Sequence, residues 1–133
     1  MLDQDLWKKQ RFVVNHLNEA DFKPIGLRPY NVYRDLGLTE ATNGLVKAHV
    51  VRAAQPCKKG DTGGRHTHDL TFQFVYLLKG WQRMEIEGQG IITVHAGSSW
   101  TQPPGIKHEV LEYSDDREAL EITMPATYNT AVD

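Results

Sequence analysis

The stretch that decides the fold runs from Gly60 to Gly80 and reads GDTGGRHTHDLTFQFVYLLKG. It places two histidines one residue apart, His66 and His68, after a glycine-rich approach, and Gln73 follows five residues later. Side chains at positions i and i+2 of a strand point to the same side, so both imidazoles can reach one metal ion from one strand. Imidazole is a ligand that suits zinc, iron, copper and nickel. The stretch therefore predicts a metal site built on a strand.

A second stretch supplies a third histidine. It runs from Gly97 to Glu112, reads GSSWTQPPGIKHEVLE, and contains a Pro103-Pro104-Gly105 corner. Proline restricts the backbone and glycine frees it, so this corner is typical of a rigid turn between strands. His108 follows three residues after the glycine. We expect the turn to deliver His108 from a neighbouring strand to the ion held by the first two histidines.

Gln73 is the fourth candidate ligand, but its position requires a change in chain direction. It lies at an odd spacing from His68, so on one unbroken strand it would face away from the histidine pair. The intervening Asp69-Leu70-Thr71 is long enough to turn or bulge. We therefore expect Gln73 to complete a set with His66, His68 and His108 that binds one divalent transition metal ion, which can be iron, manganese, nickel or zinc.

The composition is that of a soluble globular protein. The 133 residues are 40% apolar and 24% charged, and this length predicts a single domain, 1–133. The net charge is −2 and no run of lysine or arginine exceeds two residues, which argues against nucleic acid or a membrane surface as a partner. The N-terminal MLDQDLWKKQ has acidic residues where a signal peptide is basic, and no segment approaches the length of a membrane span. With a single cysteine, Cys57, the sequence predicts a reducing, cytoplasmic setting.

Residues 1–29 are predicted to form an N-terminal arm. Apolar residues recur at helical spacing over residues 3–20, and an aspartate near the start can cap a helix. Pro24 and Gly26 would end this helix. We expect the arm to cover a sheet face or to reach a partner subunit.

From Tyr30 onward the sequence changes to short β-type segments separated by turn signals, a pattern typical of an all-β sandwich or barrel. The segment 72–78 is apolar on both faces, so we expect both faces to be buried, the outer one under the arm or a second subunit. Strands are predicted over residues 31–34, 45–53, 72–78, 81–87, 91–94, 108–113 and 118–124, and residues 125–133 are predicted to be a tail.

The two histidine stretches resemble the two motifs of the cupin superfamily. In the first motif a glycine precedes a His-x-His pair, a glutamate and a second glycine; in the second, a glycine precedes Pro-x-Gly, a histidine and an asparagine. The residues that match, with Gln73 at the glutamate position and Glu112 at the asparagine position, are Gly60, His66, His68, Gln73, Gly80, Gly97, Pro103, Gly105, His108 and Glu112. The resemblance implies a small jelly-roll β-barrel with its core over residues 45–124, one metal ion in its mouth and usually a homodimer.

The resemblance makes Gln73 the informative departure. Glutamine offers a neutral carbonyl oxygen where glutamate brings a negative charge, so the ion would be a stronger Lewis acid and would favour an anionic substrate oxygen. A His-His-Gln-His set resembles that of cupins that open unsaturated uronate sugars, which also carry an acid and an arginine on the last strand. Here Glu121 can serve as the acid, but Thr127 stands near the place expected for the arginine. Cupin ring-cleavage dioxygenases with three histidines and no glutamate are the other precedent.

Several further side chains are candidates for the reaction or the pocket. Glu121 is a candidate general acid or base if it faces the cavity, and a rim carboxylate if it does not. Arg52 is the candidate for holding a substrate carboxylate through its planar guanidinium, with a surface ion pair as the alternative. A pocket for an aromatic or sugar ring would be lined by residues that can equally be core: Tyr76, Met84, Trp100 and Tyr113.

These residues predict a metal-dependent enzyme that acts on a small organic acid, aromatic or sugar-like substrate. The reaction is open between a dioxygenase and a non-redox lyase or isomerase. A non-catalytic cupin that binds or senses a small ligand is the rival hypothesis, because the barrel by itself determines no reaction. A third hypothesis is that the protein has the cupin fold but binds no metal.

Overall fold

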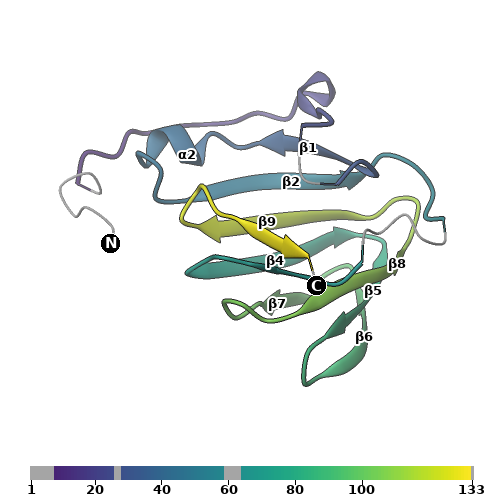
Figure 1. Cartoon of the computed structure of the whole chain (residues 1–133). Helices are drawn as coiled ribbons and strands as arrows, with labels where there is room; N and C mark the ends of the chain where they lie inside the picture. The colour runs from purple at the N-terminus through teal and green to yellow at the C-terminus, as the bar shows by residue number, and fades with distance from the viewer. Residues whose placement is uncertain (1–7, 26–27, 59–63, 133) are drawn as a thin grey trace.

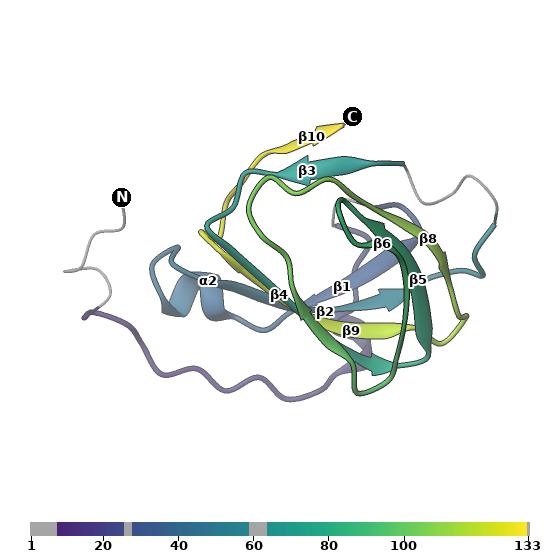
Figure 2. The ribbon, with the colours of Figure 1, turned by 90° about the horizontal axis from the view of Figure 1, so that it is seen from below.

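A computed structural model describes residues 8–25, 28–58 and 64–132 of the 133-residue chain (Figure 1). Within these residues, ten strands form two antiparallel five-stranded sheets. Figure 2 shows the two sheets curved around a common interior. Two antiparallel sheets wrapped in this way form a jelly-roll barrel, so the prediction of an all-β jelly-roll fold is confirmed.

Each sheet combines strands that are distant in the sequence. The first sheet has the order β1-β2-β9-β4-β7, and its strands are β1 (Asn31–Asp35), β2 (Lys47–Ala53), β9 (Glu118–Met124), β4 (Phe72–Lys79) and β7 (Ser99–Thr101). The second has the order β10-β3-β8-β5-β6, and its strands are β10 (Thr130–Val132), β3 (His66–His68), β8 (His108–Tyr113), β5 (Trp81–Ile86) and β6 (Gly90–His95). The helical elements of the described residues are the 3-10 turn η1 (Glu19–Asp21) and the short helix α2 (Leu38–Ala41). No helix in the described part of the chain is long and apolar enough to cross a membrane.

The pairing register carries the candidate site residues to neighbouring positions. His66 on β3 lies opposite His108 on β8, so the two histidine stretches meet at adjacent strands. In the other sheet, Glu121 on β9 lies opposite His49 on β2. The chain turns between β3 and β4, and this turn places Gln73 among the buried residues of the interior, as its odd spacing required.

The motif glycine at position 80 has a local physical reason. Gly80 follows β4 and has a φ of 75°, in the left-handed region that favours glycine. A Cβ atom there would collide with the side chains of Ser114 and Asp116. The chain can therefore pass directly from β4 into β5 only with glycine at this position.

Strand β4 has one buried and one exposed face, so the prediction that both faces are buried is wrong. The inward side chains Gln73, Val75 and Leu77 are at most 7% exposed. On the outward face the exposed fractions are 38% for Phe72, 39% for Tyr76 and 41% for Leu78. The described part of the arm, residues 8–25 and 28–29, does not cover this outward face, because it runs beside α2 and the edge strand β1 (Figure 1). The inward face joins a core of Val75, Leu77, Met84, Ile86, Val94 and Ala119.

The helix predicted over residues 3–20 is wrong for residues 8–18, which contain no helix; residues 1–7 lie outside the described part. The helical part of the arm is η1, where the Asn18 side chain accepts a hydrogen bond from the Ala20 N–H. An isolated helix of this length is marginal in water unless an apolar face packs against another element. Phe12 is 92% exposed and Leu17 is 64% exposed, so no packed face supports a helix here.

The segment predicted to be a tail carries a strand. Strand β10 pairs with β3, and Thr130 lies opposite His68. Three residues at a sheet edge give too short a pattern for a sequence-based prediction, and residue 133 lies outside the described part. The pairing matters for the site because it brings Thr130 to one of the histidine rings.

Candidate metal centre

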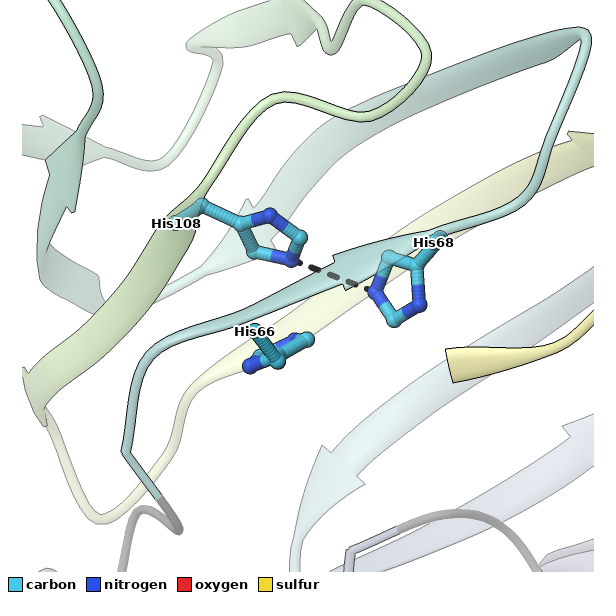
Figure 3. Close-up of side chains that lie close together, drawn as sticks. All are labelled: His66, His68 and His108. Atoms are coloured by element: carbon cyan, nitrogen blue, oxygen red, sulfur yellow. Dashed lines mark hydrogen bonds between the residues drawn. The ribbon is translucent and has the colours of Figure 1, made fainter. Parts of the chain in front are cut away.

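Three buried histidines converge inside the barrel (Figure 3). His66 and His68 come from β3, and His108 comes from the neighbouring strand β8. One ring nitrogen from each lies within 4.8 Å of the others, and the Nε2 atoms of His68 and His108 are 3.2 Å apart. The structure therefore brings together the three histidines of the two sequence stretches.

Hydrogen bonds on the far side of the rings orient the nitrogens. Nδ1 of His108 lies 3.0 Å from the Ile106 carbonyl oxygen, which can only accept, so Nδ1 donates and Nε2 keeps its lone pair. Nδ1 of His68 lies 2.9 Å from the Thr130 hydroxyl. Neighbouring ligands of one ion stand about 3.0–3.4 Å apart when the metal–nitrogen bonds are about 2.1 Å long, and the observed Nε2–Nε2 separation falls in this range. The His68–His108 pair therefore has the spacing of two ligands of one divalent transition metal.

His66 has two competing contacts at Nδ1. The Gly64 carbonyl oxygen lies 3.0 Å away, and Nη2 of Arg28 lies 2.7 Å away. A carbonyl only accepts and a guanidinium only donates, so a single Nδ1 can satisfy one of them at a time. When Nδ1 donates to Gly64, the Nε2 lone pair is free to bind a metal.

Burial lowers the pKa of all three imidazoles. It brings the pKa of His66 and that of His68 to about 4, and it lowers the pKa of His108. At pH 7 the rings are therefore neutral. Neutral imidazole is the form that binds a metal, so burial keeps the three rings in the state that can bind without losing a proton first.

Acid is expected to destabilise the metal-free protein between about pH 6.5 and pH 4. The pKa of His66 and that of His68 are about 4 in the folded chain, below the ordinary value of 6.5, so in this window the unfolded chain binds more protons. Stability is therefore present above the window and is lost as the pH falls through it, at about 1.4 kcal/mol per pKa unit. Thermal unfolding of chelator-treated protein across this range measures the loss. His66→Gln should flatten the profile, and an unchanged slope in the variant would contradict the assignment.

Glu121 is a carboxylate in the same interior, held on both oxygens. Oε1 accepts a 2.6 Å hydrogen bond from Nε2 of His49, and Oε2 accepts a 3.0 Å hydrogen bond from the Gln73 amide. The Gln73 carbonyl oxygen in turn accepts from Nε2 of Gln102 at 3.3 Å. Burial acts to raise the pKa of the Glu121 carboxyl, but the hydrogen bonds from His49 and Gln73 lower it, and the net shift is downward. Glu121 is therefore ionised at neutral pH and fixes the orientation of Gln73.

A cavity of about 460 Å³ contains these groups, and it includes two of the predicted pocket residues. Met84 and Trp100 line the cavity together with the three histidines, Gln73 and Glu121. Tyr76 does not line it, because it lies on the outward face of β4. Tyr113 is also outside the lining: it is buried and stacks on Tyr30 with ring centroids 5.4 Å apart.

The structure does not bring Arg52 to the cavity. Its guanidinium bonds Glu19 at 2.5 Å and Glu118 at 3.2 Å, and it lies 3.7 Å from the ring centroid of Phe22. Along β2, Arg52 points to the side opposite that of His49 and Val51, which line the cavity. Of the two interpretations of Arg52, a ligand for a substrate carboxylate or a member of a surface ion pair, this placement agrees with the ion pair.

The cavity lining also includes side chains that were not selected from the sequence as site residues, among them Arg28, His49, Arg117 and Tyr128. Tyr128 packs edge-on against His68 with ring centroids 5.4 Å apart. His49 shares the inward face of β2, which alternation along the strand could have indicated. Arg28 and Tyr128 lie outside the strands, where no periodicity marks the inward side.

A comparison with protein families agrees with the geometry. The model of the family described as "Cupin domain" matches residues 57–124, just over half of the 133 residues. No curated protein matches the chain.

Solved structures share the fold at low identity. The polyketide cyclase RemF from Streptomyces resistomycificus is similar with a TM-score of 0.69 and 14% identity, over 90% of this chain and 85% of that one. An RmlC-like cupin from Shewanella frigidimarina gives 0.65 and 20% identity, over 89% and 95%. The oxalate decarboxylase from Lactobacillus farciminis, in a formate complex, gives 0.63 and 17% identity, over 85% of this chain and 34% of that one. These likenesses show the shared fold, and the family match over both histidine-bearing strands shows that the chain belongs to the cupin family.

Proposed function

We propose that this cupin is a metal-dependent enzyme that acts on a small organic acid by a non-redox lyase or isomerase reaction. The observation that supports it is the juxtaposition of three neutral imidazoles and an ionised carboxylate in one buried cavity. His66, His68 and His108 would hold the ion, and the carbonyl oxygen of Gln73 would complete the set. Iron, manganese, nickel and zinc all suit these donors.

A divalent ion held there would supply Lewis acidity toward a substrate carbonyl or carboxylate oxygen. Glu121 is the group that moves the proton. An ionised carboxylate has about four lone-pair sites, and His49 and Gln73 occupy two of them, so Glu121 can still accept a proton from a substrate carbon. His49 holds the carboxyl in place while Glu121 returns the proton to another carbon or to a leaving group. We favour a lyase or isomerase over a dioxygenase because proton transfer at carbon requires such a positioned base.

The similar structures include enzymes, but they determine neither a reaction nor a substrate for this chain. One is a polyketide cyclase and another an oxalate decarboxylase in complex with formate. At 14% and 17% identity, these likenesses carry the fold and no reaction. The organic-acid substrate class is therefore argued from the cavity of this chain.

Turnover of small carboxylic acids by metal-loaded protein under nitrogen tests the proposal. Glu121→Gln is expected to lower kcat by about 10²–10⁴-fold, because the general base is lost while the shape of the side chain is kept. The metal content should stay unchanged, since Glu121 is outside the proposed ligand set. Glu112→Gln is the matched control, because Glu112 is an exposed carboxylate bonded to Arg83. Oxygen-dependent turnover with iron as the active metal would contradict the lyase or isomerase assignment.

A specific contact favours the non-catalytic alternative. Arg28 lies 2.7 Å from Nδ1 of His66, and a donating guanidinium leaves the neutral ring with its proton on Nε2. In that state His66 does not bind a metal through Nε2, and the cavity is a metal-free binding site for a small ligand. Purified protein that binds carboxylic acids without stoichiometric metal or turnover would support this alternative.

We also propose a homodimer formed through the outward face of β4. Phe72, Tyr76 and Leu78 expose apolar surface on one side of this strand, and a cluster of this kind is typical of an interaction surface. Sedimentation of the purified protein is expected to give a dimer, and Tyr76→Glu should give a monomer with an intact fold. A monomeric wild-type protein would contradict the dimer. The cytoplasmic setting stays a prediction from the sequence.

A further inference from the structure

Arg117 is a buried arginine whose donors are only partly used. The residue is 3% exposed and lines the same cavity as the histidines. Nη1 donates to Gln82 Oε1 at 3.1 Å, Nη2 donates to Asn31 Oδ1, and the buried Nε–H has no hydrogen-bond partner among the residues that the structure describes. The guanidinium also lies 4.5 Å from the centroid of the Tyr113 ring. Since a guanidinium carries five N–H donors, this cation can accommodate a further acceptor.

The surroundings of Arg117 contain no compensating acid within the described residues. The ion pairs of these residues do not include Arg117, and its hydrogen-bond partners are neutral amides. The titratable side chains that interact electrostatically with Arg117 carry phenol or thiol groups and no carboxylate: Tyr30, Tyr113, Tyr33 and Cys57. Burial lowers the pKa of the guanidinium, but arginine does not lose its proton in proteins. An anionic ligand is therefore the partner that would offset the cost of this buried charge.

The cavity is polar at two ends and apolar between them. Arg117 and Glu121 belong to the same segment at β9 and are four residues apart, which corresponds to about 13 Å at the usual strand rise. Strand β5 runs between the same two ends. Gln82 near its start accepts a hydrogen bond from Arg117, and Ile86 at its end lies opposite His108 of the histidine cluster. The lining between the two ends includes the apolar side chains Val51, Val75, Met84 and Ala119.

We propose that Arg117 binds the carboxylate of an elongated substrate, an alkyl or aryl-alkyl acid whose apolar middle lies along this lining. The other end of the substrate reaches Glu121 and the histidines. A planar guanidinium binds a carboxylate through charge-assisted hydrogen bonds, and the apolar residues bury a hydrocarbon segment of matching length. A sugar acid fits less well, because its hydroxyls would lose their hydrogen bonds with water against apolar side chains. The inference rests on the proposed function for the reacting end alone.

Octanoate and octanamide are the probes, because they share length and shape and differ in charge. Titration calorimetry with metal-free and zinc-loaded protein is expected to show octanoate binding at least about tenfold more tightly than octanamide. Arg117→Met should remove this preference. The preference is the deciding readout, because the substitution both removes a buried charge and leaves the Gln82 and Asn31 oxygens without a donor, which act on the melting temperature in opposite directions. A purely structural role for Arg117 would leave the preference for octanoate intact.

Arg83→Met is the matched control, since Arg83 is 39% exposed at its side chain and pairs with Glu112 on the surface. This variant should keep the preference for octanoate. Equal binding of the two probes, a preference that survives in Arg117→Met, or no binding of octanoate at millimolar concentration would overturn the proposal. Metal content and turnover are measured separately, and the carboxylate preference is expected in metal-free protein too. If the proposed metal-dependent function fails, the preference for octanoate over octanamide can therefore still be measured and interpreted.

Discussion

His68→Ala is expected to lower the affinity for a divalent transition metal by more than about 100-fold and to leave purified protein with little bound ion. His68 is central to the candidate set: its Nε2 lies 3.2 Å from that of His108, and its ring centroid lies 4.8 Å from that of His66. Removing it leaves two imidazoles and a neutral amide oxygen. Elemental analysis beside a zinc titration measures the effect directly.

His95→Ala is the matched control for this experiment. His95 is an exposed histidine at the end of β6, away from the buried cluster, so its loss should not change the metal content. Equal metal content in wild type, His68→Ala and His95→Ala would show that the ion is held elsewhere or nonspecifically. Wild-type protein that takes up no ion would leave the alternative of a ligand-binding cupin.

The histidine stretches could be read from the sequence because local rules govern them. Residues at i and i+2 of a strand share a side, so His66 and His68 had to point together wherever the strand lay. The turn that brings Gln73 inward followed from an odd spacing. The arm escaped prediction because its helical periodicity had no partner: a pattern specifies which face could pack, but Phe12 has nothing to pack against.

Local sequence rules do not determine which way the side chains of Arg52 and Arg117 face. Arg52 and Val51 are neighbours on β2, and a shift of one residue exchanges the cavity side for the outer side. Which side faces inward is decided by the sheet, and the sequence offered no marker for it. Arg117 follows a turn signal at Ser114–Asp116, a context typical of exposed residues. Its burial depends on Tyr30 and Asn31, which lie far away in the chain and are brought to it by the start of β1.

Gln73→Glu is expected to weaken the loss of stability that acid causes in the metal-free protein below about pH 6.5. Gln73 donates its amide N–H to Glu121 Oε2 at 3.0 Å, so a glutamate there sets two carboxylates at hydrogen-bond distance. Such a pair shares a proton, and the pKa of one carboxyl is raised. The folded variant then binds more protons than the unfolded chain above about pH 4.3, the ordinary value for glutamate, so its stability falls as the pH rises. This slope opposes the gain that His66 and His68 give the wild type between about pH 4 and pH 6.5.

A divalent ion should restore the stability of Gln73→Glu, because its charge lets both carboxylates ionise. We expect the affinity for zinc to rise by about tenfold or more over the wild type, and the gain in melting temperature on adding zinc to rise with it. Melting curves from pH 5 to pH 8, with and without zinc, measure both effects. Gln89→Glu makes the same chemical change in an exposed turn and should alter neither. If Gln73→Glu behaves like this control, the neutral oxygen at position 73 does not set the charge of the metal site. The uncompensated ion that the Lewis-acid argument requires would then have no basis in this residue.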